Sequence, residues 1–243
     1  MRLRTKIIQR IIDINERLIF YPKLKKFYAA ALQSRPVNII DVGSNKGQSI
    51  DFFRKIDNGA RVFGFEPNKK LYNKLIEKYR GNAAIQVFNK GISSSEGSLV
   101  FQENIMDETS TFEALNFESE YLKKKASVLG VSAQDIISAR YEVDVTTLSL
   151  FLDEHRDLLF DVLKIDVEGH ELQALQGLFH NGNRTKWPVR FIQIESHNDD
   201  MYLNSGNQDE IAALLEANGF AEAAKIKHGF GDFYEIVYEN RNA

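Results

Sequence analysis

Short apolar runs alternate along the chain with segments in which apolar residues recur every three or four positions. The helical spacing is clear in Leu71, Leu75 and Tyr79, and Gly81 follows as a helix stop. Strands buried on both faces of a parallel sheet are almost continuously apolar, as these runs are. The pattern predicts an α/β fold with strands at 37–40, 61–65, 84–88, 161–165 and 189–194.

The carboxyl-terminal part of the chain has the pattern of a hairpin. Strand-like runs at 223–227 and 233–238 flank the glycine-containing turn 229–231. A helix before them is expected to begin near Asn207 and to stop at Gly219, because Glu210 completes a capping box.

The alternation breaks between 98 and 145. Strand-like arms, SLVF and YEVDV, enclose a polar stretch and a predicted helix at about 117–129. A long excursion from a compact core is commonly a lid or a recognition element, and its plainer role is to cover a sheet edge. We expect 98–145 to be an inserted arm or lid within a domain at 37–243.

The amino end, residues 1–36, is expected to be a basic amphipathic helical segment. Residues 1–26 carry a net charge of +6, which leaves −9 for the rest of the chain. Ile7, Ile11, Ile14 and Leu18 lie on one helical stripe. Such a helix can touch an anionic membrane peripherally, or pack on its own domain or on a second copy in a homodimer, and packing is the commoner outcome. Charged residues at 13, 16 and 17 exclude a secretory signal or a membrane span.

Composition narrows the classes of function. A chain of 243 residues that is 43% hydrophobic and 27% charged fits one α/β domain with an added segment. The absence of cysteine excludes a disulfide framework and a thiolate zinc site, and it suits a cytoplasmic protein. The net charge of −3 argues against a nucleic-acid partner.

A nucleotide-type loop is expected after the first strand. Gly43, Asn45 and Gly47 follow Asp41, and glycines let a backbone approach a ligand closely while the next helix presents free N–H groups. Glu66 stands at the tip of the second strand, where such folds grip a ribose diol. Two matched parts predict a cofactor site.

The tips of later strands carry candidate chemistry. Asn89 and Gly91 follow the third strand, either lining an adenine base or forming a solvated turn. Asp166, Glu195 and His197 follow the fourth and fifth strands, with Glu168 nearby, so these groups should converge in one cleft. Convergent acids and an imidazole can bind a divalent ion, act as a general base, or hold a substrate hydroxyl or amine.

Four blocks, IDVGSNKG, FEPN, LKIDVEGHELQALQG and IQIESH, resemble the signature of the FkbM family of S-adenosylmethionine-dependent methyltransferases. The resemblance spans roughly residues 37 to 240. It implies a class I methyltransferase (Rossmann-like) fold, with a seven-stranded, mostly parallel sheet whose last strand is antiparallel.

The resemblance also implies roles for individual residues. Ser44 stands where the family usually has Ala, and Ser149 where it commonly has Asp in a turn after the strand at Val143. The loop that holds the methionine part of S-adenosylmethionine is matched by Asp41, Gly43, Ser44, Asn45 and Gly47. Glu66 matches the ribose-binding acid, and Asn68 lies beside it. Asp166 and Glu168 match the acids that face the sulfonium, and Glu195 with His197 matches the side that binds the methyl acceptor.

The family is associated with O-methylation of hydroxyls on sugars and natural products, so a small-molecule or glycan hydroxyl is the expected acceptor. His197 is the predicted base, with Asp166 orienting it or the acceptor, and a rival mechanism places Mg²⁺ on Asp166 and Glu195. A cofactor-binding module without turnover stays an alternative. An NAD-dependent oxidoreductase would need the motif G-x-G-x-x-G, which this chain lacks. A methyltransferase that modifies nucleic-acid bases would be expected to carry Asn/Asp-Pro-Pro after the fourth strand, where this chain has DVEG.

Overall fold

The fold is built on one large sheet. The computed structural model of the protein describes residues 14–32, 37–106, 109–180, 186–196, 200–203, 208–229 and 233–242. The main sheet has seven strands in the order β3-β2-β1-β7-β8-β10-β9. These are β1 (Asn38–Val42), β2 (Arg61–Phe65), β3 (Ile85–Phe88), β7 (Phe160–Ile165), β8 (Val189–Ser196), β9 (Phe220–Lys227) and β10 (Tyr234–Asn240).

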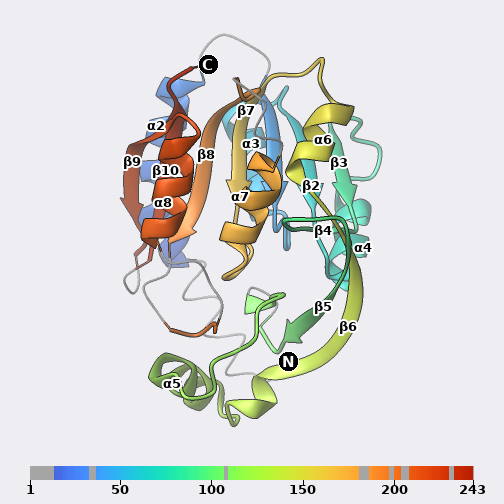
Figure 1. The fold of residues 1–243 in the computed structure, drawn as a ribbon, viewed down its shortest axis with the longest axis vertical. Helices are drawn as coiled ribbons and strands as arrows, with labels where there is room; N and C mark the ends of the chain where they lie inside the picture. Colours follow the sequence, from blue (N-terminus) through green and yellow to red (C-terminus); the bar gives the residue numbers. More distant parts are fainter. Residues whose placement is uncertain are drawn as a thin grey trace.

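The pairing of these strands confirms the predicted topology. β1 pairs in parallel with β2 and β7, and β7 pairs in parallel with β8. β10 alone runs against its neighbours, β8 and β9. The carboxyl ends of the parallel strands all point toward one end of the molecule, the lower end in Figure 1. Ligands bind at this edge in doubly wound sheets.

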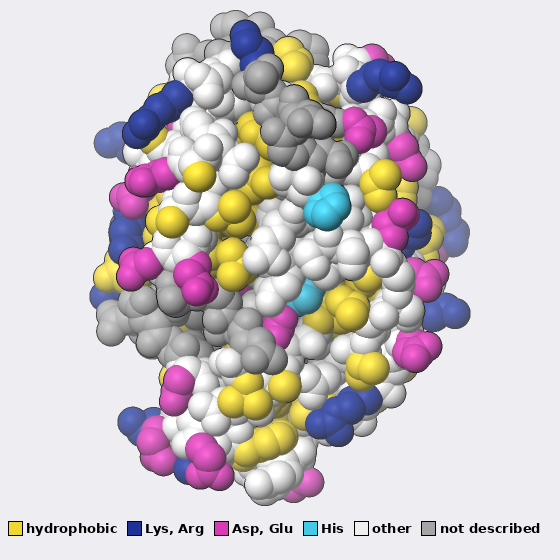
Figure 2. All heavy atoms as spheres, in the orientation of Figure 1, with side chains coloured by type: hydrophobic (Ala, Val, Ile, Leu, Met, Phe, Trp, Pro, Cys, Tyr) yellow, Lys and Arg dark blue, Asp and Glu magenta, His cyan; other side chains and the backbone are white. Residues whose placement is uncertain are grey.

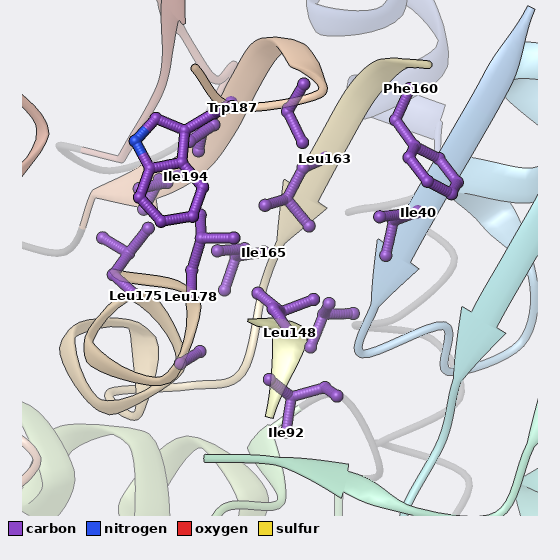
Figure 3. Packing of buried hydrophobic residues seen from close by; sticks show 14 of the residues in the cluster. Ile40, Ile92, Leu148, Phe160, Leu163, Ile165, Leu175, Leu178, Trp187 and Ile194 are labelled. Atoms are coloured by element: carbon purple, nitrogen blue, oxygen red, sulfur yellow. The ribbon is translucent and has the colours of Figure 1, made fainter. Parts of the chain in front are cut away.

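Helices cover both faces of the sheet, which explains why its strands are apolar on both sides. Side chains of α2 (Tyr21–Ala31) and α3 (Gln48–Ile56) pack on one face, and those of α6 (Leu148–Glu154), α7 (Glu171–Phe179) and α8 (Gln208–Ala217) on the other. Figure 3 shows Leu175 and Leu178 of α7 directed toward Ile165 and Ile194 of the sheet. The remaining helix of the βαβ units is α4 (Lys69–Lys78).

One helix was not anticipated. The Thr147 side chain accepts a hydrogen bond from the Leu150 backbone N–H and caps α6. Ser149, in the turn where the family commonly has Asp, therefore lies in the first turn of a helix and is buried.

A second, three-stranded sheet extends from the carboxyl edge of the main one (Figure 1). The predicted arms pair antiparallel, with Val100 opposite Glu142. The added parts are β4 (Gly91–Ile92), β5 (Gly97–Asn104), α5 (Glu120–Leu129), the 3₁₀ turn η3 (Gln134–Ile136) and β6 (Ile137–Thr146). This sheet already begins at Gly91, whereas the boundaries 98–145 of an inserted lid stay a prediction.

The described part of the amino-terminal segment packs on the main sheet. It comprises a π-helical turn, η1 (Glu16–Phe20), followed by α2. Phe20, Leu24 and Tyr28 are buried, and the Tyr28 hydroxyl donates to Gln193 Oε1 at 2.7 Å. Packing on its own domain is thus one of the roles expected for this segment. Among the described helices, none combines the length and apolar character required to cross a bilayer.

Candidate active site

A cavity of about 1020 Å³ opens at the carboxyl edge of the main sheet. Its walls come from the loop after β1, the ends of β2, β7 and β8, residues 109–112, the amino-terminal helices and the β9–β10 hairpin. Seven predicted site residues line it: Gly43, Ser44, Asn45, Glu66, Asp166, Glu168 and Glu195.

The loop after β1 has a backbone that side chains would obstruct. Gly43 has φ +85°, and a Cβ there would lie 1.9 Å from the Asp166 carbonyl oxygen. Asn45 also adopts a positive φ of 48°. The N–H groups of Gly43 and Ser44 both donate to the Phe65 carbonyl at 3.0 Å. The loop is therefore held between β2 and the end of β7 with its backbone along the cavity.

Glu66 ties this loop to the next one. One carboxylate oxygen accepts the Asn45 N–H at 2.7 Å, and the other accepts the Asn68 N–H at 2.8 Å. Glu66 also lines the cavity, and a carboxylate accepts hydrogen bonds of the kind that a diol donates. The Asn45 side-chain oxygen is buried with no hydrogen-bond partner among the described residues. A polar cofactor that donates hydrogen bonds fits this corner.

Polar side chains form a row across the sheet on the face covered by α2 and α3. Asp41, Lys164, Gln193 and Glu235 each lie two residues from an apolar residue on the same face, namely Ile39, Val162, Phe191 and Val237. Asp166 and Glu195 lie two residues beyond Lys164 and Gln193. The β-ladder registers place Asp41 opposite Lys164, Lys164 opposite Gln193, and Glu195 opposite Glu235. We call this set, Asp41, Lys164, Asp166, Gln193, Glu195 and Glu235, the polar row.

Lys164 is the cation of the polar row. Its Nζ donates to Asp166 Oδ2 at 2.7 Å, and only 7% of its side chain is exposed. Burial lowers the pKa of Lys164, but the charges of Asp166, Glu235 and Asp41 outweigh it and hold the pKa above the ordinary value. Lys164 is thus a fixed positive charge, and its position suits it to orient Asp166.

Two acids in the row are shifted toward the protonated form. Burial raises the pKa of Asp41, which Lys164 partly opposes. Burial also raises the pKa of Glu235 to about 7, with Lys164 lowering it and Glu195 raising it. Glu235 lines the cavity, and its Oε2 is buried without a hydrogen-bond partner in the described part of the chain.

His228 lies between the amino-terminal segment and the polar row. Its Nδ1 is 3.0 Å from Glu16 Oε1, its Nε2 is 3.7 Å from Glu195 Oε1, and its ring stacks on Phe20 with centroids 4.1 Å apart. Burial lowers the pKa of His228, but the bond with Glu16 and the charges of Glu195 and Glu235 give a net rise. His228 therefore joins η1 to Glu195 of the polar row.

Glu168, the second acid of the DVEG loop, also lines the cavity. It has φ +54°, and the Tyr202 hydroxyl donates to its Oε2 at 2.6 Å. Oxygens of Asp166, Glu168 and Glu195 all lie within 4.8 Å of one another. This is the group of carboxylates among the described residues that could hold a divalent ion.

Several predicted residues lie away from the cavity lining. Gly47 begins α3, where a Cβ would lie 2.3 Å from the Tyr79 hydroxyl, and Asn68 caps α4 by accepting from the Lys70 and Leu71 amides. The Asn89 amide donates to the Glu66 and Pro67 carbonyls at 2.9 and 3.0 Å. Gly91 is buried in β4. His197, the predicted base, lies outside the described residues.

Sequence reasoning overlooked Lys164, Glu235 and His228. Lys164 carries a detectable signal, because a polar residue recurs at every second position near the carboxyl tips of the parallel strands, as in LKID and IQIE. Alternation of this kind marks one face of a strand. Glu235 does not carry this signal, since it stands near the start of its strand with Phe233 and Val237 two positions away. His228 carries no comparable signal, since only the hairpin and η1 bring it to the site.

The cavity and sheet were compared with known proteins. The profile of the FkbM methyltransferase domain matches residues 41–221. A methyltransferase sdnD from Sordaria araneosa is 28% identical over 206 residues, 79% of this chain and 76% of that protein. A hexuronic acid methyltransferase, AglP, from Haloferax volcanii is 27% identical over 158 residues, 65% of this chain and 54% of that protein.

A solved structure has a similar fold. Magnesium protoporphyrin IX methyltransferase (ChlM) from Synechocystis PCC 6803, with bound SAH, superposes with a TM-score of 0.51 at 12% identity, covering 96% of this chain and 85% of that one. At this identity the similarity concerns the fold alone. The domain match, the two relatives and the strand order agree. The chain belongs to the FkbM methyltransferase family and is an S-adenosylmethionine-dependent methyltransferase with the class I fold.

Proposed function

We propose that this enzyme is an O-methyltransferase that methylates a hydroxyl of a sugar, a glycan or a natural-product-like acceptor. The observation that carries the proposal is the cluster of carboxylates, Asp166, Glu195 and Glu235, at the cavity next to the loop of Gly43. Ionised carboxylates accept hydrogen bonds, and a protonated carboxyl, as Glu235 is below its pKa of about 7, also donates one, so the cluster suits an acceptor rich in hydroxyls. The name of the relative AglP, a hexuronic acid methyltransferase, supports a sugar-type acceptor.

The residues of the chain have separable roles in this reaction. S-adenosylmethionine supplies, when bound, an electrophilic methyl group on a sulfonium sulfur. The loop of Gly43 and Asn45 and the carboxylate of Glu66 would hold the cofactor. Asp166, fixed by Lys164, and Glu195 orient the acceptor hydroxyl, since near-attack geometry accounts for much of the rate. His197 takes the hydroxyl proton, an assignment that stays a prediction from the sequence.

A labelled-methyl assay tests the proposal. The purified protein is incubated with S-adenosylmethionine carrying a deuterated methyl group and with glucose, glucuronic acid or galacturonic acid, and products are analysed by mass spectrometry. A methyl ether resists mild alkali, whereas a methyl ester is hydrolysed. An alkali-stable labelled sugar supports hydroxyl methylation. A product that mild alkali cleaves would contradict it and make a carboxylate the acceptor.

A bound Mg²⁺ is the rival to a protein base. The motivating geometry is the approach of Asp166, Glu168 and Glu195 oxygens to within 4.8 Å of one another. A divalent ion there would lower the pKa of the acceptor hydroxyl as a Lewis acid. We expect full methyl transfer in excess EDTA. Loss of activity in EDTA that added Mg²⁺ restores would favour the ion instead.

A cofactor-binding module without turnover is the remaining alternative. It predicts calorimetric binding of S-adenosylmethionine together with no methyl transfer to any hydroxylated acceptor. Both measurements use the same protein preparation, so an inactive preparation is recognised by its failure to bind the cofactor.

A further inference from the structure

A short segment between β5 and α5 crosses the carboxyl edge of the sheet. We call residues 109–116 the strap. At one end, Thr111 and Gln102 of β5 exchange backbone hydrogen bonds of 2.8 and 3.1 Å. At the other end, the Asn116 N–H donates to the Met201 carbonyl at 2.8 Å. Residues 109–112 of the strap line the cavity, so the strap forms part of its wall.

The middle of the strap is attached by a buried chain of side-chain hydrogen bonds. His170 Nδ1 lies 2.7 Å from Glu113 Oε1, and His170 Nε2 lies 3.0 Å from Ser93 Oγ. All three residues are buried: His170 is 4% exposed, Glu113 6% and Ser93 5%. They come from the N-cap of α7, the strap and the residue after β4. Because all three are buried, removing one leaves polar atoms without water or partner.

The same part of the strap holds the DVEG loop. The Glu113 N–H donates to Thr111 Oγ1 at 2.9 Å, and Thr111 Oγ1 donates to the Glu168 carbonyl at 2.7 Å. Glu168 occupies the left-handed region at φ +54°, which surrounding contacts must stabilise. Movement of Glu113 would therefore disturb the residue that places a carboxylate in the cavity.

The order serine, histidine, acid also occurs in hydrolases, but this geometry does not suit a nucleophile. Ser93 is buried and does not line the cavity. Its carbonyl oxygen packs against α7 so closely that a Cβ at Gly177 would lie 2.0 Å away. A buried hydroxyl that does not line the cavity is out of reach of an acyl substrate bound there, so the chain of bonds serves position.

We propose that Glu113, His170 and Ser93 are positioning residues that clamp the strap to the DVEG loop and thereby fix the acceptor-facing wall of the cavity. This inference rests on the proposed function in one respect, which is that this wall of the cavity contacts the methyl acceptor. It assigns no direct contact between the three residues and either substrate. Cofactor binding, which uses the loop of Gly43 on another strand, should not depend on the clamp.

Amide hydrogen exchange tests the clamp without any acceptor. In Glu113→Ala and His170→Ala, we expect exchange of the amides at Thr111, Glu113 and Glu168 to rise about tenfold or more, because a buried hydrogen bond is lost. Affinity for S-adenosylhomocysteine, measured by calorimetry, should stay within about twofold. Glu113→Gln keeps an acceptor for Nδ1–H and should restore most of the protection. Glu118→Ala, just beyond the strap with a side chain 92% exposed, is the matched control.

Kinetics then separate a positioning role from a purely structural one. With whichever sugar of the labelled-methyl assay is methylated, Glu113→Ala should raise the acceptor KM about tenfold while KM for S-adenosylmethionine stays unchanged. Unaltered exchange in both alanine variants would overturn the proposal, as would equal increases in both KM values. If the alanine variants do not fold, Ser93→Ala, which removes the other partner of His170, undergoes the same measurements: faster exchange at Thr111, Glu113 and Glu168 supports the clamp, and unaltered exchange overturns it. If no sugar is methylated, the proposed function fails while the exchange data still decide the clamp.

Discussion

At the scale of single residues, Glu66 shows how one side chain serves both fold and ligand. Its carboxylate accepts the N–H groups of Asn45 and Asn68, and thus connects the loops after β1 and β2. The same group lines the cavity at the position where the family resemblance implies a ribose-binding acid.

We predict that Glu66→Ala weakens binding of S-adenosylmethionine by about 10- to 100-fold, because charge-assisted hydrogen bonds are lost. Isothermal calorimetry measures the change. Glu77→Ala removes a carboxylate that is 65% exposed on α4 and should bind like the wild type. An unchanged affinity for Glu66→Ala would refute its role in cofactor binding.

The base is the second prediction at this scale. His197→Ala should keep cofactor affinity but reduce kcat by about 10²- to 10⁴-fold, the usual contribution of a general base. His180→Ala, which changes an exposed histidine at the end of α7, is the control. Turnover near the wild-type rate in His197→Ala would transfer the role to another group.

At the scale of elements, the loop between β1 and α3 depends on close backbone contact with the end of β7. A Cβ at Gly43 would meet the Asp166 carbonyl at 1.9 Å, while one at Gly81, with a similar positive φ, would meet nothing within 4 Å. The two glycines therefore separate backbone strain from steric exclusion.

We predict that Gly43→Ala lowers the free energy of unfolding by about 3 kcal/mol and abolishes cofactor binding, since the loop must move away from β7. Gly81→Ala should lose only about 1 kcal/mol, from its positive φ, and bind the cofactor normally. Urea denaturation and calorimetry measure the two effects. Equal behaviour of both variants would show that the contact with Asp166 is unimportant.

At the scale of the whole molecule, charged side chains of both signs are mixed on the described part of the face that Figure 2 shows. On the described part of the face in Figure 2, lysines and arginines are interleaved with acidic side chains along the margins. Two acids of the polar row, Asp41 and Glu235, are buried instead, and burial raises the pKa of both, so the stability of the folded state responds to their titration.

Glu235 makes stability depend on pH. Burial raises its pKa from 4.5 to about 7, so the folded state binds the proton more tightly than the unfolded state does. The stability contributed is fully present below pH 4.5 and is lost as pH rises to about 7. Glu235→Gln removes the titrating group and therefore this pH-dependent loss of stability. The free energy of unfolding of the variant, relative to that of the wild type, should rise by about 3 kcal/mol between pH 4.5 and 8.

Urea denaturation at several pH values measures this difference. Glu239→Gln, on the same strand with a side chain 46% exposed, is the matched control. A constant difference between Glu235→Gln and wild type across the range would mean that Glu235 titrates alike in the folded and unfolded states.

The sequence alone determined the strands of the main sheet, most of the helices around it and the glycine-containing loop after β1. Apolar periodicity and glycine positions act over a few neighbouring residues, so local pattern is enough to locate segments such as 61–65 and the turn after Asp41. The four sequence blocks also predicted that Glu66, Asp166 and Glu195 lie at one edge of the sheet, because the carboxyl ends of parallel strands meet at the same edge.

Only the tertiary structure decided which side chains meet. The polar row exists because β10 enters beside β8 and sets Glu235 opposite Glu195. Similarly, Glu113 contacts His170, which is 57 positions away in the sequence, and His228 contacts Glu16, which is 212 positions away. Contacts between residues so far apart in sequence depend on how the whole core packs, because strand order and helix packing are fixed together when the core is buried. The local pattern of apolar residues does not specify them.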